Sequence, residues 1–431
     1  MTVQAFRGEI LTVPDDPAQG GEIRHFADGL LLVEDGMVVS CGPYAEPGGI
    51  AVEHLPGLIV PGFVDAHVHY PQIECIASHG EQLMLWLERH IFPAEKAFAD
   101  RGHADSVAAF FLDELLRHGT TSALVFATVH AGSVDALFEA ALERDMRIVS
   151  GKVLMDLGPD GLRDTVASGR ADTEALIARW RGRGRLGYAV TPRFVPTSSD
   201  EQLADAGALV AAHPDVLMHT HLSENTDEIA FVAERFPEAA DYLDVYDRFG
   251  LVGPRSIFAH CVHMSERALA RMAQAGAGIA FCPTSNLFLG SGPFDLASAD
   301  RHAVRVGIGT DIGAGTSLSV LHTLGEAYKI CQIHGCSLDP FRALHLATAA
   351  GARVMGIGDR VGGLLPGQEA DFIVLDSAAT PLLAHRSAGA SLHDRLFALQ
   401  ILGDDRAVVA TYLRGRRAQC SGSISRGRGT R

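Results

Sequence analysis

The chain is poor in lysine and in long apolar stretches, and each shortage excludes a class of protein. Its 431 residues carry a net charge of -16, and its only lysines are Lys96, Lys152 and Lys329. Because nucleic-acid binding depends largely on Lys and Arg that meet phosphates, we expect no nucleic-acid partner. No apolar run approaches the roughly 20 residues of a membrane span. The opening MTVQAFRGEILTV also lacks a basic region followed by a long apolar core. We therefore expect neither a membrane partner nor a secretory signal.

Paired cysteines are also missing. The 7 cysteines are odd in number and scattered, and no two form a CxxC pair. This pattern favours reduced thiols over a disulfide framework, and it predicts a cytoplasmic protein. A hydrophobic content of 47% and a charged content of 20% are those of an ordinary globular protein. The length allows one large domain and a smaller one.

Both ends of the chain predict β-strands. GEILTV and GLLLVEDGMVVSCG are apolar or alternating, and Glu34-Asp35-Gly36 offers the chemistry of a hairpin turn. ADFIVLD and AVVATYLRG are predicted to form strands after the break GGLLPGQ. We predict one small β-sandwich domain built from residues 1–60 and 366–420. Residues 421–431, which include the basic SRGRGTR, are predicted to be a disordered tail.

Residues 61–365 predict a (β/α)₈ barrel of the TIM type. Helical patterns such as HADSVAAFFLDELLRHG and SVDALFEAALERDM separate most of the strand-like runs, and strict alternation implies a parallel sheet. The rival is a doubly wound open sheet, but no GxGxxG follows the first run and no GxxxxGK[ST] occurs. Eight apolar runs supply the strands: LIVPGFVDAHVH, TTSALVFA, RIVSGKVL, LGYAVTPRF, VLMHTHLSE, SIFAHCVHM, GIAFCPTSN and RVGIGTDIGAG.

Unusual polar residues fall at the ends of these runs. A bare His-x-His pair means little, because about one is expected by chance among 20 His in 431 residues. In a barrel, however, active sites collect at the C-terminal ends of the strands. Three histidines and a carboxylate suit a catalytic Zn²⁺ or Fe²⁺ ion that keeps one position for water. The predicted ligands are His67, His69, His221 and Asp311. Since the fourth run carries no lysine to bridge two ions and Lys152 lies on the third, we expect one metal ion.

Several motifs together resemble the amidohydrolase superfamily. PGFVDAHVH, HLSE, AHCVH and GTDIGAG occur in this order, and GLLPGQEADFIVLD follows them near the end. Within the superfamily the sequence resembles the guanine deaminase family, through HVHYPQ, WLERHIFPAE, TPRF, HLSEN and GTDIGAGTSLS. The resemblance covers nearly the whole chain. The other zinc deaminase design uses a PCxxC sequence, which is absent here.

The resemblance implies a role for each site residue. His67, His69, His221 and Asp311 would hold one zinc ion, and the chain would work as a homodimer in purine catabolism. The residues implied to contact the purine base guanine are Gln72, Arg193, Phe194, His221 and Glu224.

A mechanism follows as a hypothesis. Asp311 accepts a proton from water, His260 holds that water, and Glu224 protonates the ring nitrogen beside C2 and then the leaving amine. Arg193 suits the O6 carbonyl because it only donates, and Gln72 offers a donor and an acceptor to a ring edge. The products would be xanthine and ammonia.

Three further residues and two rival functions complete the interpretation. Tyr70, where the family commonly has a small residue, would narrow the mouth of the barrel, and His219 would orient a metal ligand. Trp86 would pack on a helix after the first strand, in a segment that could also cover the pocket. The TSN sequence after the seventh run is left without a role.

One rival function is that of another deaminase or hydrolase on this scaffold, acting on adenosine-type thioethers, 8-oxoguanine or triazines. The other is a barrel that has lost catalysis and serves as a scaffold.

Overall fold

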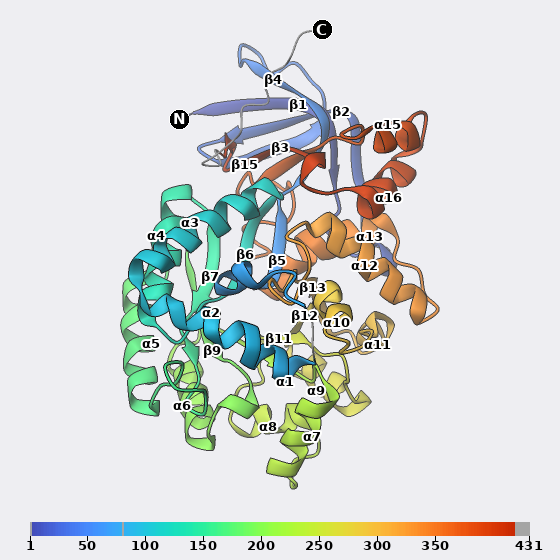
Figure 1. The fold of residues 1–431 in the computed structure, drawn as a ribbon. Coiled ribbons are helices and arrows are strands. Elements are labelled where there is room, and N and C mark those ends of the chain that lie inside the picture. The colour runs from blue at the N-terminus through green and yellow to red at the C-terminus, as the bar shows by residue number, and fades with distance from the viewer. Residues whose placement is uncertain (1, 80–81, 419–431) are drawn as a thin grey trace.

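Eight parallel strands form the centre of the molecule, as the sequence predicted (Figure 1). The computed structural model describes residues 2–79 and 82–418; the predicted tail over 421–431 lies outside them. A short extra strand, β8 (Val153–Leu154), pairs with β9. The eight strands are β5 (Phe63–His69), β6 (Thr120–Phe126), β7 (Arg147–Gly151), β9 (Gly187–Pro192), β10 (Leu217–Leu222), β11 (Ser256–His260), β12 (Gly278–Phe281) and β13 (Arg305–Ile308).

The barrel closes where its last strand meets its first. The backbone N–H of His69 donates to the carbonyl of Ile312 at 2.9 Å, and that of Asp311 donates to the carbonyl of His67 at 2.9 Å. These two bonds place the loop after β13 against the end of β5. Inside the barrel, small side chains such as Ala66, Ala189 and Ala280 pack with Val64, Leu124, Val149, Leu217 and Ile257 in one buried cluster.

Helices surround the strands, and side-chain caps fix where several begin. Asp100 accepts from the backbone N–H of His103, and Thr165 from that of Ser168, as N-cap residues do. The helices are α3 (Arg101–Arg117), α4 (Ala131–Arg144), α5 (Val166–Trp180), α6 (Asp200–Ala212), α7 (Thr226–Arg235), α8 (Tyr242–Arg248), α9 (Glu266–Ala275), α10 (Pro283–Phe288), α11 (Leu296–Arg301), α12 (Val320–Ile333), α13 (Pro340–His345) and α14 (Gly351–Val354). Within the described residues, no helix is both long and apolar enough to cross a membrane.

The two ends of the chain build one seven-stranded sheet beside the barrel, at the top of Figure 1. β1 pairs with both β2 and β4, and β4 with β14, so that hydrogen bonds join strands from both ends of the chain in the one small β domain that the sequence predicted. Asp35 and Gly36, both at positive φ, make the predicted hairpin turn. The strands are β1 (Val3–Thr12), β2 (Arg24–Glu34), β3 (Met37–Pro43), β4 (Val52–Pro61), β14 (Phe372–Leu375), β15 (Val408–Leu413) and β16 (Arg416–Arg417).

Helices α15 (Pro381–Ser387) and α16 (Leu392–Leu402) interrupt the C-terminal strands. They lie within the segment that was predicted to belong to the β domain. Gln400 of α16 donates from Nε2 to the carbonyl of Leu324 on α12 at 3.1 Å. This insertion therefore packs on the barrel rather than extending the sheet.

A segment after β5 lies across the barrel mouth, and in Figure 1 its α1 and α2 run in front of the strands. It consists of η2 (Tyr70–Cys75), α1 (Leu83–Trp86), a π-helical turn η3 (Leu87–Ile91) and α2 (Phe92–Lys96). Its apolar side chains pack with Phe194, Leu289 and Ala314 from the far rim of the barrel. This segment supplies the outer wall of the site described next.

Candidate active site

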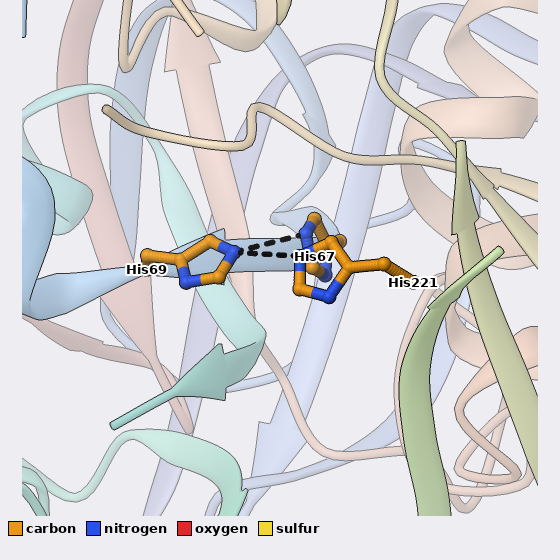
Figure 2. Close-up of side chains that lie close together, drawn as sticks. All are labelled: His67, His69 and His221. Atoms are coloured by element: carbon orange, nitrogen blue, oxygen red, sulfur yellow. Dashed lines mark hydrogen bonds between the residues drawn. The ribbon is translucent and has the colours of Figure 1, made fainter. Parts of the chain in front are cut away.

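Three histidines from two strands meet at the barrel mouth. His67 and His69 lie on β5, which is buried along its whole length, and His221 lies on β10. The Nε2 atom of His69 lies 3.2 Å from Nε2 of His67 and 3.1 Å from Nε2 of His221. Figure 2 shows His69 facing the other two rings. Because side chains two apart on a strand share a face, the His-x-His spacing alone places two of the three.

The opposite ring nitrogens are held by partners outside this cluster. Nδ1 of His221 lies 2.7 Å from the backbone carbonyl of Arg193, which can only accept a hydrogen bond. Nδ1 of His67 lies 2.8 Å from Nε2 of His219. A proton on Nδ1 leaves the lone pair of Nε2 directed into the cluster. His219 thus lies where the sequence interpretation placed an orienting residue.

A carboxylate completes the group. Oδ1 of Asp311 lies 3.1 Å from Nε2 of His67 and 3.4 Å from Nε2 of His69. Asp311 follows β13 and has a left-handed backbone, as does His260, the last residue of β11. Such strained conformations concentrate at functional sites. All four predicted ligands therefore converge.

This donor set fits a divalent metal ion. Burial lowers the pKa of His67, His69 and His221 well below the usual value, so their rings are neutral and can coordinate. Three imidazole nitrogens that face one another at such distances repel unless a cation or a proton lies among them. His67, His69 and His221 form one group whose candidate ligand atoms lie within 4.8 Å of one another, and His67, Cys282 and Asp311 form a second. Three imidazoles and a carboxylate with room for water are characteristic of catalytic sites.

A second pair lies beside the cluster. Nε2 of His260 is 3.4 Å from Oε2 of Glu224 and 3.7 Å from Oδ2 of Asp311. Nδ1 of His260 is 2.9 Å from Oδ1 of Asn286, the Asn of the TSN sequence on α10. An amide oxygen accepts from Nδ1–H, which leaves Nε2 free to face the two carboxylates. Asn286 thus gains the role that sequence reasoning left open.

Glu224 is fully enclosed. Burial, followed by the nearby Asp311, raises the pKa of Glu224 well above its usual value. Ser291 approaches its Oε1 at 3.5 Å. A buried carboxyl group that retains its proton can act as an acid, which is the chemistry that the sequence interpretation required of it.

The pocket beside these groups has a polar floor and an apolar roof. Gln72, Arg193, Phe194 and Glu224, all predicted to contact a ligand, line it together with His221 and Asp311. Leu83, Trp86, Leu87, Leu289 and Ala314 supply the apolar part. A mostly apolar pocket with a few directed polar groups is typical of a small-molecule site.

A carboxylate that the sequence analysis did not single out links two of the predicted contacts. Glu95, on α2, accepts from Nη1 of Arg193 at 3.0 Å (Oε1) and 2.7 Å (Oε2). Its Oε1 also accepts from Nε2 of Gln72 at 3.2 Å. Glu95 ends the quoted motif WLERHIFPAE, but a charged residue in a helical pattern gives no sign of burial.

Gln72 is more constrained than expected. Its Nε2 lies 3.0 Å from Nδ1 of His69 as well as beside Glu95, and its Oε1 accepts from the N–H of Gly313 at 3.2 Å. The amide therefore has little free donor capacity to offer a ligand edge in this arrangement. A metal bound at Nε2 of His69 would put the ring proton on Nδ1, which the amide oxygen rather than the nitrogen of Gln72 would accept.

Three other residues need comment. Tyr70 does not narrow the mouth: its side chain is fully buried between Phe98 and Phe111, and its hydroxyl donates to the carbonyl of Ser133 at 2.7 Å. The prediction was wrong because the chain turns into η2 at Tyr70.

Trp86 packs as expected but also lines the pocket. Lys152 pairs with Asp164 at 2.5 Å, away from the histidine cluster.

Comparison with known proteins gives consistent results. A model of the amidohydrolase family matches residues 58–418. Guanine deaminase of Escherichia coli is 49% identical over 427 residues, which is 96% of this chain and 97% of that protein. Its solved structure matches with a TM-score of 0.93 at 47% identity, covering 98% of this chain and 100% of that one. A guanine deaminase from C. acetobutylicum, crystallised with guanine in its active site, matches with a TM-score of 0.90 at 28% identity over 97% of this chain and 100% of that one.

Proposed function

The chain belongs to the amidohydrolase family and, within it, to the guanine deaminases, and from this premise we propose that it hydrolyses guanine to xanthine and ammonia at one zinc ion. One observation carries the proposal. Three elements open into the same pocket: the buried acid Glu224, the donor Arg193, and the group of predicted ligands, called here the metal-type cluster (His67, His69, His221 and Asp311). These three elements are what a hydrolytic deamination needs: an activated water, a proton source for the leaving amine, and a recognition group for the ring.

His67, His69, His221 and Asp311 would hold the ion. A bound zinc ion supplies the Lewis acidity that makes water a nucleophile near neutral pH. Nitrogen ligands with one carboxylate suit Zn²⁺ and Fe²⁺, and zinc is the proposed ion.

Asp311 and His260 would prepare the water. The Oδ2 atom of Asp311 lies 3.7 Å from His260 Nε2, so a water beside the two atoms would contact a proton acceptor and a positioning ring together. As the water oxygen adds to C2 of guanine, its proton passes to Asp311. His260 at the end of β11 and Asp311 in the loop after β13 both have a left-handed backbone, which natural side chains rarely adopt away from functional sites.

Glu224 would move protons on the purine side. It gives its proton to the ring nitrogen beside C2 when the water adds. The proton that Asp311 took from the water then goes to the amine as the C2–N bond breaks and ammonia leaves, and Glu224 regains a proton from the C2 hydroxyl as the carbonyl of xanthine forms. The raised pKa of Glu224 keeps its proton in place until the water adds. Such transfers typically contribute about 10²–10⁴-fold to the rate.

Arg193 and Phe194 would select the ring. The guanidinium group is a donor only, so it fits the O6 carbonyl of guanine and would leave the amino group of adenine without an acceptor. A site built on such bonds can reject a wrong analogue by roughly 10⁴–10⁵-fold. The Phe194 ring lies in the pocket wall and would pack against the purine.

Ammonia release by the purified protein, with metal quantified in the same sample, tests the function. Guanine is compared with adenine, cytosine, 8-oxoguanine and a triazine. Strong preference for guanine with about one zinc per chain supports the proposal. Activity on another ring would keep the ligands and overturn the role of Arg193. Full metal with no turnover would favour the scaffold alternative.

Two attributes of the family are proposed with this function. The first is a homodimer, which light scattering of the purified protein tests directly. The second is a cytoplasmic location in purine catabolism; it is supported by the six described cysteines, none of which forms a disulfide. Fractionation of cells that express the tagged protein tests this location.

A further inference from the structure

Glu95 is a buried charge that the reaction does not use. Its side chain is fully buried, and it is not among the described residues that line the pocket. Its carboxylate oxygens meet Arg193 Nη1 at 3.0 and 2.7 Å and Gln72 Nε2 at 3.2 Å. A buried carboxylate carries a desolvation cost that only such partners offset.

Arg193 is held on two sides. Glu95 binds one end of the guanidinium group, and the ring of Phe92 lies 5.4 Å from its central carbon. The group has five N–H donors, and those on Nη1 meet Glu95. The donors on Nε and Nη2 therefore point in a direction that the ion pair fixes. The same carboxylate accepts from Nε2 of Gln72, so that one residue outside the pocket contacts two of the residues that line it.

The ion pair of Glu95 and Arg193 also sets the net charge on the polar side of the pocket. Arg193 and Glu95 are 3% and 1% exposed, so little solvent screens them, and together they carry no net charge. Guanine is neutral near neutral pH. Its product xanthine gains a second carbonyl and is a stronger acid, so part of it is an anion. An arginine without its carboxylate would bind that anion more tightly than the neutral substrate.

We propose that Glu95 is a positioning residue that aims Arg193 and Gln72 and cancels the charge of Arg193, so that the pocket accepts neutral guanine and releases its more acidic product. This inference rests on the proposed function for the identity of the ligand. It predicts that neutralising the carboxylate weakens the binding of guanine but strengthens the binding of xanthine. A merely structural loss would weaken the binding of both.

The test compares xanthine with hypoxanthine, which stays largely neutral at the same mildly alkaline pH. Equilibrium binding of each is measured for the wild type, Glu95→Gln and Glu95→Asp. In Glu95→Gln, we expect the ratio of xanthine affinity to hypoxanthine affinity to rise roughly tenfold. We expect kcat/KM for guanine to fall roughly 10- to 100-fold, mainly through KM, with metal content unchanged. In Glu95→Asp, which keeps the charge on a shorter side chain, the xanthine-to-hypoxanthine ratio should stay at the wild-type value while KM for guanine rises.

Glu369→Gln is the matched control. Glu369 is also a buried carboxylate, and it pairs with Arg147 and Arg185 where the barrel meets the β domain. Its substitution should leave the binding ratio and the KM unchanged. An unchanged ratio in Glu95→Gln, or a changed ratio in Glu95→Asp, would overturn the charge argument. An unchanged KM in Glu95→Asp would overturn the positioning argument.

The binding measurement needs no turnover, so it separates the two proposals. A wild-type protein that fails to deaminate guanine but shows the expected shift in Glu95→Gln would refute the proposed function and keep the role of Glu95. A wild-type protein that binds neither purine would overturn both. If Glu95→Gln does not fold, the Glu95→Asp protein still tests both parts, because a changed binding ratio would overturn the charge argument and an unchanged KM would overturn the positioning argument.

Discussion

His219 contacts His67 at 2.8 Å, from Nε2 to Nδ1, on the side of the ring away from the metal-type cluster. His219 is fully buried, and its own Nδ1 has no partner among the described residues. Burial lowers the pKa of both rings well below the usual value, so neither is charged near neutral pH. When Nδ1 of His67 donates to Nε2 of His219, the Nε2 lone pair of His67 faces the cluster and is free to bind a metal.

We predict that His219→Ala weakens metal binding by roughly 10- to 100-fold, as losses of partners behind a metal ligand do. Zinc content after dialysis against a graded chelator series measures this. His385→Ala, an exposed histidine on α15, serves as the control and should retain zinc as the wild type does. Equal zinc retention by the two variants would show that His67 needs no help from His219.

Glu224→Gln should separate chemistry from metal binding. Glutamine keeps the shape of the side chain but has no proton to give as an acid. We expect full zinc content and a fall in kcat of roughly 10²–10⁴-fold. Elemental analysis and ammonia release on the same sample decide the matter. Near-normal turnover would remove Glu224 from the proposed mechanism.

Arg193→Ala should weaken guanine use while metal remains. The backbone carbonyl of Arg193 still accepts from Nδ1 of His221 after this substitution, because only the side chain is removed. We expect kcat/KM for guanine to fall by roughly 10²-fold or more, with about one zinc per chain retained. Loss of stability is also expected, since Glu95 is left buried without its cation. Activity is therefore measured well below the melting temperature, and an unchanged kcat/KM would contradict the assigned O6 contact.

The barrel and the metal-type cluster could be predicted because local sequence determines both. Eight apolar runs separated by helical patterns specify the strands, and polar residues at the ends of parallel strands meet at one rim. The alternation of side chains along a strand was enough to predict that His67 and His69 share a face. The prediction of His221 and Asp311 also required the rule that the ends of the barrel strands converge.

The sequence could not predict where side chains point when they leave irregular segments of backbone. Tyr70 follows a strand directly, yet the turn into η2 rotates it into the core. Glu95 lies on a short helix after a π-helical turn, so a regular helical period does not place it. Asn286 touches His260 from another element, and no spacing in the chain encodes that contact. The β domain was predicted from both chain ends, but which of its strands pair was not: β4 pairs with β14, more than 300 residues away.

Trp86 offers a direct signal of purine binding. The chain has 2 tryptophans, and Trp180 donates to Asp135 at 2.6 Å in a separate part of the core. In a Trp180→Phe background, Trp86 is the sole indole, and it lines the pocket. We predict that xanthine changes its emission in a saturable way, because a stacked purine alters the surroundings of the ring. The reciprocal Trp86→Phe variant should show no such response. A signal that follows Trp180 instead would show that the segment over residues 83–96 does not cover the ligand.

The junction of barrel and β domain should show a specific dependence on pH. Glu369 pairs with Arg185 at 2.7 Å and with Arg147, which lies on β7. Burial alone would raise the pKa of Glu369, but the two guanidinium groups outweigh it, so that the pKa lies below its usual 4.5. A carboxyl group whose pKa is lowered on folding stabilises the native state above its unfolded-state pKa. That contribution is lost as the pH falls through the folded-state value.

We therefore expect Glu369→Gln to be less stable than the wild type near neutral pH, and the gap to shrink as the pH is lowered below about 4.5. Urea unfolding at a series of pH values measures the gap directly. Asp371 shares Arg185, and its pKa is raised by burial and by the nearby Glu369, so the substitution also lowers the pKa of Asp371 and the measured gap includes that smaller change. A gap that stays constant into acid would mean that the loss comes from packing of the side chain, because only the charged form of Glu369 attracts the two arginines.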